Sequence, residues 1–312
     1  MEKIKVLAVV GPTASGKSAL AVELAGRYGG EVVSCDSMQI YKHMAVATAK
    51  PTAEEMQGIP HHLIDFLEPT ERFSVAEYVT LAGKVIADIH ARGKLPIICG
   101  GTGLYFSSLI HGITFSEAGS DPAYRKALEQ RAASEGAQVL LDELRAFDPE
   151  SAAKLHPNNL KRIIRAMEHY KLTGKTITEQ NEMSRATPSA YEALTFAIGF
   201  RDRQNLYERI HRRVDHMCET GLLAEAAWYF AQSGFSTASA AIGYKELQPY
   251  FEGVMSLEEA LENLKKETRH YAKRQLTWFR REENIRWLYA DAPEQGSLAA
   301  QACAIIEEES FI

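Results

Sequence analysis

The stretch "VLAVVGPTASGKS", which begins at Val6, contains the residues whose types and spacing most clearly predict chemistry. Gly11, Gly16, Lys17 and Ser18 match the phosphate-loop pattern G-x-x-x-x-G-K-[ST]. Glycines let backbone N–H groups point at phosphate oxygens, and the positive end of the following helix strengthens the attraction. We therefore expect a phosphate site in which Lys17 neutralises charge and Ser18 binds Mg²⁺. The pattern leaves the ligand open, because any diphosphate or triphosphate with Mg²⁺ offers similar oxygens.

A carboxylate is expected beside this loop. In "EVVSCDSMQIY" an apolar strand ends at Asp36, and in a doubly wound sheet the carboxyl ends of the strands surround the phosphate loop. Asp36 could hold Mg²⁺ indirectly or accept a proton from an attacking nucleophile, and a turn or helix-capping role is the structural alternative. Ser37, Gln39 and Tyr41 follow at alternate positions, where they offer hydrogen bonds and a stacking surface.

A second glycine-rich turn occurs in "PIICGGTGLYF". An apolar strand at 96–99 precedes Gly100, Gly101 and Gly103, which surround Thr102, and a helix is predicted to follow. No aspartate stands at the end of this strand, so we do not expect a conventional Mg²⁺-binding strand end. The Thr102 hydroxyl either faces the substrate or caps the helix.

The spacing of histidine and cysteine favours structural roles. In "HHLID", the adjacent His61 and His62 point to opposite faces of an extended strand, so we do not expect them to share one metal with Asp65. The cysteines are dispersed without a C-x-x-C pair, which indicates neither a disulfide framework nor a zinc site. We expect these cysteines to be small core residues: Cys35, Cys99, Cys218 and Cys303.

The composition predicts a globular enzyme with locally concentrated positive charge. The chain has 312 residues, 46% of them hydrophobic, and a net charge of −6, so it can bury a large core. The longest N-terminal apolar run is too short for a signal-peptide core or a membrane span, and we expect a cytoplasmic protein without a membrane partner. Residues 154–175 nevertheless carry six Lys or Arg against one acid, and residues 265–286 carry eight against three. Charge segregated in this way can bind nucleic acid.

Three predicted helices have a basic face opposite an apolar one, at about 100° per residue. Their basic residues are Lys161, Arg162, Arg165 and His169; Arg209, Arg212, Arg213 and His216; and Lys266, Arg269, Lys273 and Arg280. The apolar residues opposite them are Ile163, Met167 and Tyr170; Ile210, Val214 and Met217; and Leu264, Tyr271 and Trp278. A solvated surface is the ordinary explanation of one such face, but three in an acidic protein favour binding to phosphates.

A parallel sheet is required to bring these residues together. Strands are expected at 4–10, 31–35, 62–66, 95–99, 194–200 and 285–289, and helices near 17–28, 74–92 and 102–110. This alternation predicts an α/β fold with a P-loop NTPase-like core, in which helices flank a parallel sheet. Residues 113–193 show only helical patterns, with breaks at Asp148-Pro149, His156-Pro157 and Gly174. We therefore predict a core domain formed by 1–112 and 194–312 and an all-helical insertion domain at 113–193.

Taken together, the motifs resemble one family, the tRNA dimethylallyltransferases, which prenylate the adenosine just 3′ of the anticodon. The matching motifs run in the family's order from residue 11 to residue 280: "GPTASGKS", "DSMQIYKHM", "TAKPT", "HHLID", "GGTGLY", "HPNNLKRIIRAME", "RIHRRVDHM", "AIGYKEL" and "YAKRQLTWFR". Asn159 departs from the aspartate that is common in the "HPNN" turn, which concerns one helix cap. The resemblance implies that the phosphate loop holds the pyrophosphate of dimethylallyl diphosphate, with Mg²⁺, instead of ATP.

The resemblance also implies roles for individual residues. Asp36 removes the proton of the adenine amine with help from Thr102, and Lys17 stabilises the departing pyrophosphate together with Mg²⁺ on Ser18. The expected diphosphate contacts are Gly11, Thr13, Ala14, Ser15, Gly16, Lys17, Ser18 and Arg213. The expected tRNA contacts are Asp36, Ser37, Met38, Gln39, Thr102, Lys161, Arg162, Ile163, Ile164, Arg165, Lys273 and Arg280. We expect a monomer whose insertion domain grips the tRNA anticodon stem-loop while a flipped purine enters a pocket.

Three other functions stay open on the sequence. An ATP-dependent small-molecule phosphotransferase would use the phosphate loop and the sheet, but it gives the helical insert and the basic faces no role. An adenylate prenyltransferase that acts on a free nucleotide would not need an insert that grips RNA. A nucleic-acid-binding module without catalysis would explain the basic faces, but it would not explain Lys17, Ser18 and Asp36 together.

Overall fold

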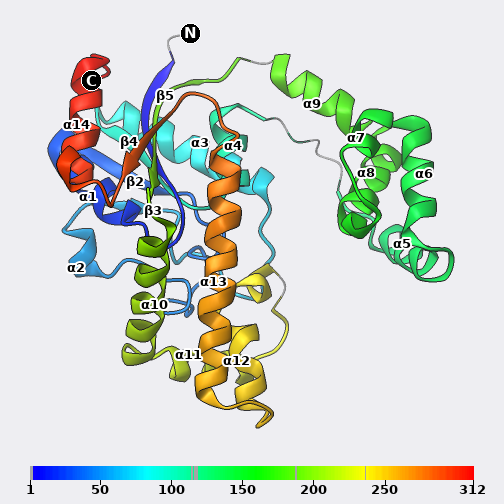
Figure 1. Cartoon of the computed structure of the whole chain (residues 1–312). Coiled ribbons are helices and arrows are strands. Elements are labelled where there is room, and N and C mark those ends of the chain that lie inside the picture. The colour runs from blue at the N-terminus through cyan, green and yellow to red at the C-terminus, as the bar shows by residue number, and fades with distance from the viewer. Residues whose placement is uncertain (1–2, 114, 116–118, 187, 236) are drawn as a thin grey trace. The chain divides into compact units, whose positions relative to one another are not determined.

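The protein consists of two compact units. The structure, a computed structural model, describes residues 3–113, 115, 119–186, 188–235 and 237–312. Contacts within the chain separate residues 1–110 and 190–312, the core unit, from residues 111–189, the helical unit (Figure 1). The division falls where the last helix before the insert ends at Ile110 and the next strand begins at Tyr191. This strand starts earlier than the predicted residue 194.

The core unit is built on six parallel strands in the order β3-β2-β4-β1-β5-β6. Their bounds are β1 Ile4–Val10, β2 Gly30–Ser34, β3 His61–His62, β4 Leu95–Gly100, β5 Tyr191–Gly199 and β6 Ile285–Tyr289. The central strands are nearly continuous apolar runs, because helices cover both faces of a parallel sheet. The predicted α/β core is therefore confirmed. The predicted strand at 62–66 is wrong in extent, since only His61 and His62 pair with β2.

Two hydrophobic clusters lie on opposite faces of this sheet. Successive side chains of a strand alternate between faces, so Val6 and Val10 of β1 join one cluster and Leu7 and Val9 join the other. The helices on the Val6 side include α3 Val75–Ala91, α4 Gly103–Ile110, α10 Arg203–Glu219, α11 Leu222–Ala231, α12 Tyr244–Phe251 and α13 Leu257–Phe279. The helices on the Leu7 side are α1 Lys17–Tyr28 and α14 Leu298–Glu308. A short helix, α2 Ala53–Met56, and the 3₁₀ turns Thr237–Ala240 and Pro293–Gln295 complete the unit.

The strand order determines where a site can form. β4 lies between β1 and β2, with Val10 opposite Gly100 and Ser34 opposite Cys99. The three carboxyl ends therefore meet at one edge of the sheet. This edge receives the phosphate loop after β1, Asp36 after β2 and the second glycine-rich turn after β4, as doubly wound sheets do.

The helical unit has its own core and, among its described residues, no strand. Its helices are α5 Pro122–Glu135, α6 Ala137–Phe147, α7 Pro149–Ala153, α8 Leu160–Thr173 and α9 Ile177–Ala186, with a 3₁₀ turn at Pro157–Asn159. The predicted breaks are confirmed: Asp148 accepts a hydrogen bond from Ser151 N at the start of α7, and Gly174 ends α8 with φ 67°. Asn159 Oδ1 accepts from His156 N at 3.0 Å, so its side chain stabilises the turn before α8.

Among the residues that the structure describes, no helix is long and apolar enough to cross a lipid bilayer.

Candidate active site

The phosphate loop adopts a conformation that turns its backbone toward a ligand. Ala14 and Gly16 have positive φ values of 61° and 97°, and alternation of such residues with ordinary ones makes backbone N–H groups converge. Gly16 precedes α1 and makes no side-chain cap, so the first N–H groups of α1 depend on a ligand or water. Arg209 Nε donates to Ala14 O at 2.8 Å and holds the loop from α10. The loop thus has the backbone conformation that the predicted phosphate site requires.

Two cations stand close together at this loop. Burial lowers the pKa of Lys17, and the nearby positive charge of Arg213 lowers it further, while Asp36 acts in the opposite direction. Burial also lowers the pKa of Arg213, and Asp36 again opposes the shift. Since both side chains lose hydration and repel each other, an anion bound between them would be strongly stabilised.

A cavity of about 330 Å³ opens in front of these cations. One part of its wall is polar and contains Thr13, Lys17, Asp36, Ser37, Gln39 and Arg213. Another part is apolar and contains Ala47, Val214, Met217, Leu222, Ala241, Ile242 and Leu264. The volume suits a small ligand, and the division of the wall suits one with a charged end and a hydrocarbon end.

Asp36 and Thr102 are fixed beside each other at the sheet edge. Asp36 Oδ1 accepts hydrogen bonds from Met38 N at 2.9 Å and Gln39 N at 3.3 Å, which orients the carboxylate. The Thr102 hydroxyl accepts from Ser37 N at 3.0 Å and donates to Ser37 Oγ at 3.2 Å. This hydroxyl therefore links the two strand ends instead of serving only as a helix cap.

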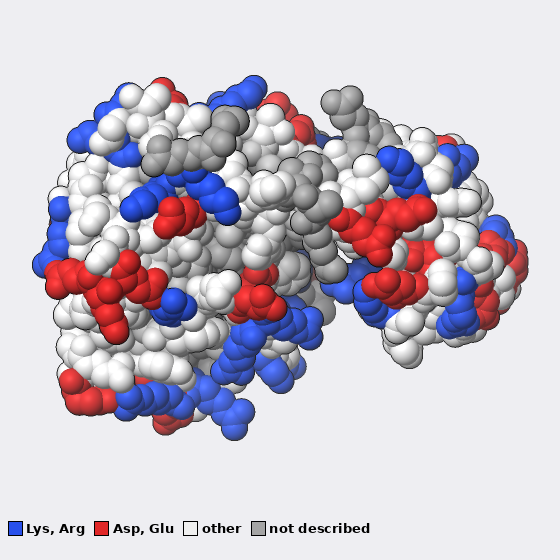
Figure 2. All heavy atoms as spheres, turned by 90° about the horizontal axis from the view of Figure 1, so that it is seen from above, with Lys and Arg blue, Asp and Glu red and all other residues white. Residues whose placement is uncertain are grey.

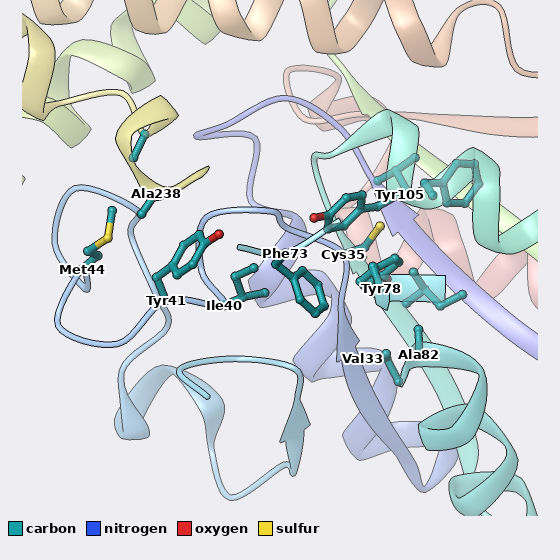
Figure 3. Close-up of a cluster of buried hydrophobic side chains, with 14 of the residues drawn as sticks. Val33, Cys35, Ile40, Tyr41, Met44, Phe73, Tyr78, Ala82, Tyr105 and Ala238 are labelled. Atoms are coloured by element: carbon teal, nitrogen blue, oxygen red, sulfur yellow. The ribbon is translucent and has the colours of Figure 1, made fainter. Parts of the chain in front are cut away.

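A buried aromatic cluster supports the turn that carries Asp36. Cys35 points into this cluster, where Tyr78 and Tyr105 stack with ring centroids 4.3 Å apart (Figure 3). Burial raises the pKa of Cys35 to about 12, so the thiol stays neutral. Because successive residues of an extended chain face opposite sides, anchoring Cys35 inward turns Asp36 toward the cavity. The predicted core role holds for Cys35, Cys99 and Cys303, whereas Cys218 is half-buried.

The two histidines of "HHLID" make separate structural contacts. His61 Nδ1 lies 2.8 Å from Ile59 O, and His62 Nε2 lies 2.7 Å from Glu31 Oε2. Hydrogen bonds from Arg92, reinforced by His62, lower the pKa of Glu31 to about 2. His61 also borders a cavity of about 20 Å³, which Ser18 and Ser34 line as well and which shares Lys17, Asp36 and Gln39 with the larger cavity.

Several cavity residues were not predicted from the sequence as site residues. Tyr271, which we placed on the apolar side of α13, lines the cavity, and burial raises its pKa, with a smaller effect from the charge of Asp36. Gln275, one turn further along, and Lys245 of α12 also line it. A signal was present for Gln275, because it is a polar residue within the apolar stripe that contains Leu264 and Tyr271.

The basic faces of α10 and α13 differ from the simple helical pattern. Arg212 and His216 are exposed, whereas Arg213 is half-buried and turns to the cavity. On α13, Lys273 and Arg280 are exposed, while Arg269 Nη1 lies 2.5 Å from His211 Nε2. Trp278 is 37% exposed, although the pattern placed it on the apolar side. Lys and Arg side chains gather in separate patches on the visible surface of each unit, interrupted by acidic ones (Figure 2).

On α8, Lys161, Arg162 and Arg165 are exposed, as predicted. The helical pattern is wrong for His169 and Tyr170, and it is the packing of this helix that decides which side chains are exposed. Ile163 and Ile164 are 0% and 4% exposed, so their side chains pack in the core of the helical unit and only their backbone could contact RNA. His169 is 2% exposed and does not belong to the basic face, and Tyr170, predicted apolar, is 40% exposed. The buried surface is wider than one stripe because α8 packs against α5, α6 and α9.

A buried carboxylate orders part of this basic surface. Glu168 is fully buried and accepts hydrogen bonds from Arg125 Nη2 at 2.6 Å and Arg165 Nη1 at 2.9 Å. Burial alone would raise the pKa of Glu168, but these bonds and that of Asp121 N lower it to about 2. Arg165 is therefore held in place on the surface of α8 by a charged partner.

Comparison with known proteins supports the resemblance noted above. The family model "IPP transferase" matches residues 39–282, and the model "Isopentenyl transferase" matches residues 4–69. The tRNA dimethylallyltransferase of Caldanaerobacter subterraneus is 49% identical over 292 residues, which cover 92% of each chain. That of Halalkalibacterium halodurans is 50% identical over 286 residues, which cover 91% of each chain.

Solved structures agree with these sequence matches. The tRNA isopentenylpyrophosphate transferase from Bacillus halodurans is 45% identical with a TM-score of 0.71, and the match covers 99% of this chain and 98% of that one. A eukaryotic dimethylallyltransferase acting on tRNA is 31% identical with a TM-score of 0.84, and the match covers 99% of this chain and 79% of that one. Sequence, fold and motif order agree over nearly the whole length, and the chain belongs to the IPP transferase family, the family of the tRNA dimethylallyltransferases.

Proposed function

We propose that this protein transfers a dimethylallyl group from dimethylallyl diphosphate to the exocyclic amine of the adenosine 3′ to the anticodon in tRNA, and releases diphosphate. The observation that carries the proposal is one cavity with two kinds of wall. Lys17 and Arg213 offer positive charge for a diphosphate, the apolar wall offers space for five carbons, and Asp36 stands beside both. Family membership gives the same reaction class.

The residues support a direct transfer. The adenine amine is a poor nucleophile, whereas an allylic diphosphate ionises readily because the developing charge spreads over the allyl group. The nitrogen–carbon bond forms as the carbon–oxygen bond to diphosphate breaks. Lys17, Arg213 and the loop N–H groups stabilise the departing diphosphate, and the proton of the amine passes to Asp36, with Oδ2 as its acceptor.

The residues beside the phosphate loop fit Mg²⁺. Ser18 is exposed at the start of α1, and it shares the small cavity with Asp36. A hydroxyl, a carboxylate and room for water suit Mg²⁺, which usually takes its remaining ligands from substrate phosphates. Among the described residues no group of three or more His, Cys, Asp or Glu could hold a metal, so binding would depend on the diphosphate. We propose that Ser18 binds Mg²⁺ directly and Asp36 through water, and the ion would add positive charge at the diphosphate.

The proposed tRNA contacts lie in both units. In the core unit they are the cavity residues from Asp36 to Gln39, Thr102, Lys273 and Arg280. In the helical unit they are the exposed side chains Lys161, Arg162 and Arg165, without Ile163 and Ile164. The target base must leave its stack to reach the cavity.

The reaction is tested by its substrates. Labelled dimethylallyl diphosphate is incubated with the protein and either bulk tRNA or AMP, and γ-labelled ATP is supplied in a parallel reaction. Transfer of the prenyl label to tRNA alone supports the proposal. Labelling of AMP would indicate an adenylate prenyltransferase, and Mg²⁺-dependent ATP binding that the prenyl donor cannot displace would indicate a phosphotransferase.

The variant Asp36→Asn distinguishes a general-base role of Asp36 from a role in metal binding, because it preserves the shape of the side chain but removes the proton acceptor. A general base predicts that single-turnover transfer slows by about 10²–10⁴-fold while tRNA and donor still bind. A residue that acts mainly by holding Mg²⁺ predicts recovery at high Mg²⁺. An Mg²⁺ titration of the variant decides, and recovery of most of the rate would overturn the general-base role.

RNA binding by the α8 surface is tested by charge removal. Arg162→Gln combined with Arg165→Gln should weaken tRNA binding and reduce its salt dependence, because fewer counterions are released, and donor affinity should stay the same. Lys84→Gln combined with Lys94→Gln is the matched control, since Lys94 precedes β4 at the opposite end of the sheet from the site. Equal losses in the two double variants would contradict a specific surface.

A further inference from the structure

Gln275 joins the two glycine-rich turns of the site. This side chain of α13 is 5% exposed. Its Oε1 accepts a hydrogen bond from Thr13 N in the phosphate loop at 2.9 Å, and its Nε2 donates to Gly101 O in the second turn at 2.9 Å. One amide therefore connects the ends of β1 and β4 through a third element of the chain.

The space around this amide leaves little freedom of movement. A Cβ added to Gly101 would lie 2.1 Å from Gln275 Nε2 and 3.2 Å from Gly11 O. Gly101 is thus pressed between the amide and the backbone of the phosphate loop. A shift of the Gln275 amide toward Gly101 therefore moves the turn, because the two groups are already in contact on that side.

The residue after Gly101 is Thr102, whose hydroxyl bonds both Ser37 N and Ser37 Oγ. The position of Thr102 relative to the phosphate loop therefore depends on the Thr13–Gln275–Gly101 connection. Tyr271, one turn earlier on α13, lines the same cavity. The face of α13 that contains Tyr271 and Gln275 is therefore part of the site.

We propose that Gln275 is a positioning residue, which fixes the Thr102 hydroxyl, and the Ser37 turn that it bonds, relative to the phosphate loop. The proposal rests on the prenyl transfer proposed above. An amide is the required group, because one side of the connection needs an acceptor and the other needs a donor. A carboxylate keeps only the acceptor, and an apolar side chain keeps neither.

Two variants distinguish the contribution of the hydrogen bond to Gly101 O from that of the hydrogen bond to Thr13 N. Gln275→Glu still accepts from Thr13 N but places an oxygen against Gly101 O, so Thr102 should shift while the phosphate loop stays in place. We expect single-turnover prenyl transfer to fall about 10–100-fold, as small misplacements of reacting groups do, with the Kd of an unreactive thio analogue of the donor within threefold of wild type. Gln275→Met, which loses both bonds, should weaken donor binding as well.

A double-mutant cycle tests whether Gln275 acts through Thr102. In a Thr102→Ala background, Gln275→Glu should cost less than about threefold, because the hydroxyl that it positions is gone. A full 10–100-fold loss in that background would overturn the proposal. Unchanged transfer by Gln275→Glu in the otherwise wild-type chain would overturn it equally.

A matched control exists elsewhere in the core unit. Gln301 of α14 accepts from Tyr289 N at 3.0 Å and donates to Tyr289 O at 3.1 Å. Gln301→Glu should lower the melting temperature without slowing transfer, which distinguishes loss of stability from loss of position. If the wild-type protein transfers no prenyl group, the proposed function fails. If the wild-type protein transfers the prenyl group and Gln275→Glu transfers it at the same rate, only the positioning role fails.

Discussion

The two glycine-rich turns of the site look alike in sequence but use glycine for different physical reasons. In the phosphate loop, Gly16 has φ 97°, and an added Cβ would meet nothing closer than 3.4 Å. In the second turn the glycines lie outside the left-handed region, but a Cβ on Gly100 would lie 2.0 Å from Cys35 O and one on Gly103 would lie 2.4 Å from Trp278. The first turn needs the backbone freedom of glycine, and the second needs the missing side chain.

This difference indicates what shapes each turn. The phosphate loop turns at Ala14 and Gly16, which have positive φ, and it is held from outside by hydrogen bonds rather than by close steric contact with Gly16. The second turn is shaped by its neighbours, since β2 and α13 press on it from the positions of Cys35, Gln275 and Trp278. Substitution of Gly16 in the first turn should therefore affect ligand binding more than stability, and substitution of Gly100 in the second should affect stability first.

The largest loss of stability is expected for Gly100→Ala. The added methyl group meets backbone atoms of Cys35, which cannot rotate away, so β2 and β4 must separate. We expect the free energy of unfolding to fall by about 3–5 kcal/mol, which is at the upper end of the losses caused by single substitutions. Urea denaturation followed by circular dichroism measures this loss. A loss below about 1 kcal/mol would show that the close packing of this turn is not essential.

Lys17→Met should strongly reduce the rate of prenyl transfer without lowering the stability of the protein. Removing the charge that stabilises the departing diphosphate should reduce single-turnover transfer by about 10²–10³-fold. The free energy of unfolding should stay the same or rise, because burial already disfavours the charged form of Lys17. The affinity for tRNA, measured by filter binding, serves as the control, and a loss there equal to the loss in rate would contradict the assignment.

Gly16→Ala should have a moderate effect. Alanine at a φ near 97° is strained by about 1–2 kcal/mol, although its Cβ would make only ordinary van der Waals contacts, with Arg209 Nη2 at 3.4 Å and Leu298 Cδ1 at 3.8 Å. We expect a modest drop in the free energy of unfolding and weaker binding of the donor analogue, both measured on the same preparation. If this substitution costs as much stability as Gly100→Ala, the contrast between the two turns does not hold.

Gly26→Ala should have the smallest effect and the opposite sign. Gly26 lies in α1 and is exposed. A Cβ added there would have no neighbour within 4 Å. Alanine should therefore raise the free energy of unfolding by about 0.5–1 kcal/mol and leave transfer unchanged. A thermal melt is sufficient to detect this gain, and destabilisation would mean that the packing around α1 is tighter than the structure shows.

Most of the fold could be predicted from local patterns. The β-branched runs of β1, β2 and β4, each followed by glycine or aspartate, predicted both the parallel sheet and the edge at which the chemistry gathers. The length of β3 could not be predicted, because pairing of His61 and His62 depends on β2 and not on their own propensity. The start of β5 at Tyr191 likewise depends on pairing with β1, which begins opposite it at Ile4.

The residues of the candidate site could be predicted only where they belong to a short sequence motif. Lys17, Asp36 and Thr102 occur in short glycine- or strand-associated patterns, and the structure brings them to one sheet edge. Gln275 and Tyr271 reach the cavity from α13, far away in the chain, and helical periodicity alone assigns them to a buried face. His169 shows the reverse limitation, because periodicity placed it among exposed cations while helix packing buried it.

The strand order also has a consequence for how the chain folds. β1 pairs with β4 on one side and with β5 on the other, so β1 is synthesised well before β5, the partner that follows the whole helical unit. The helical unit is continuous in sequence and has its own hydrophobic cluster, and its ends lie together, since a Cβ on Gly112 would lie 3.6 Å from Ser189 Cα. Early folding of this segment shortens the loop that β1 and β5 must close. Synthesis therefore favours an order in which the inserted segment folds first and the surrounding sheet closes last.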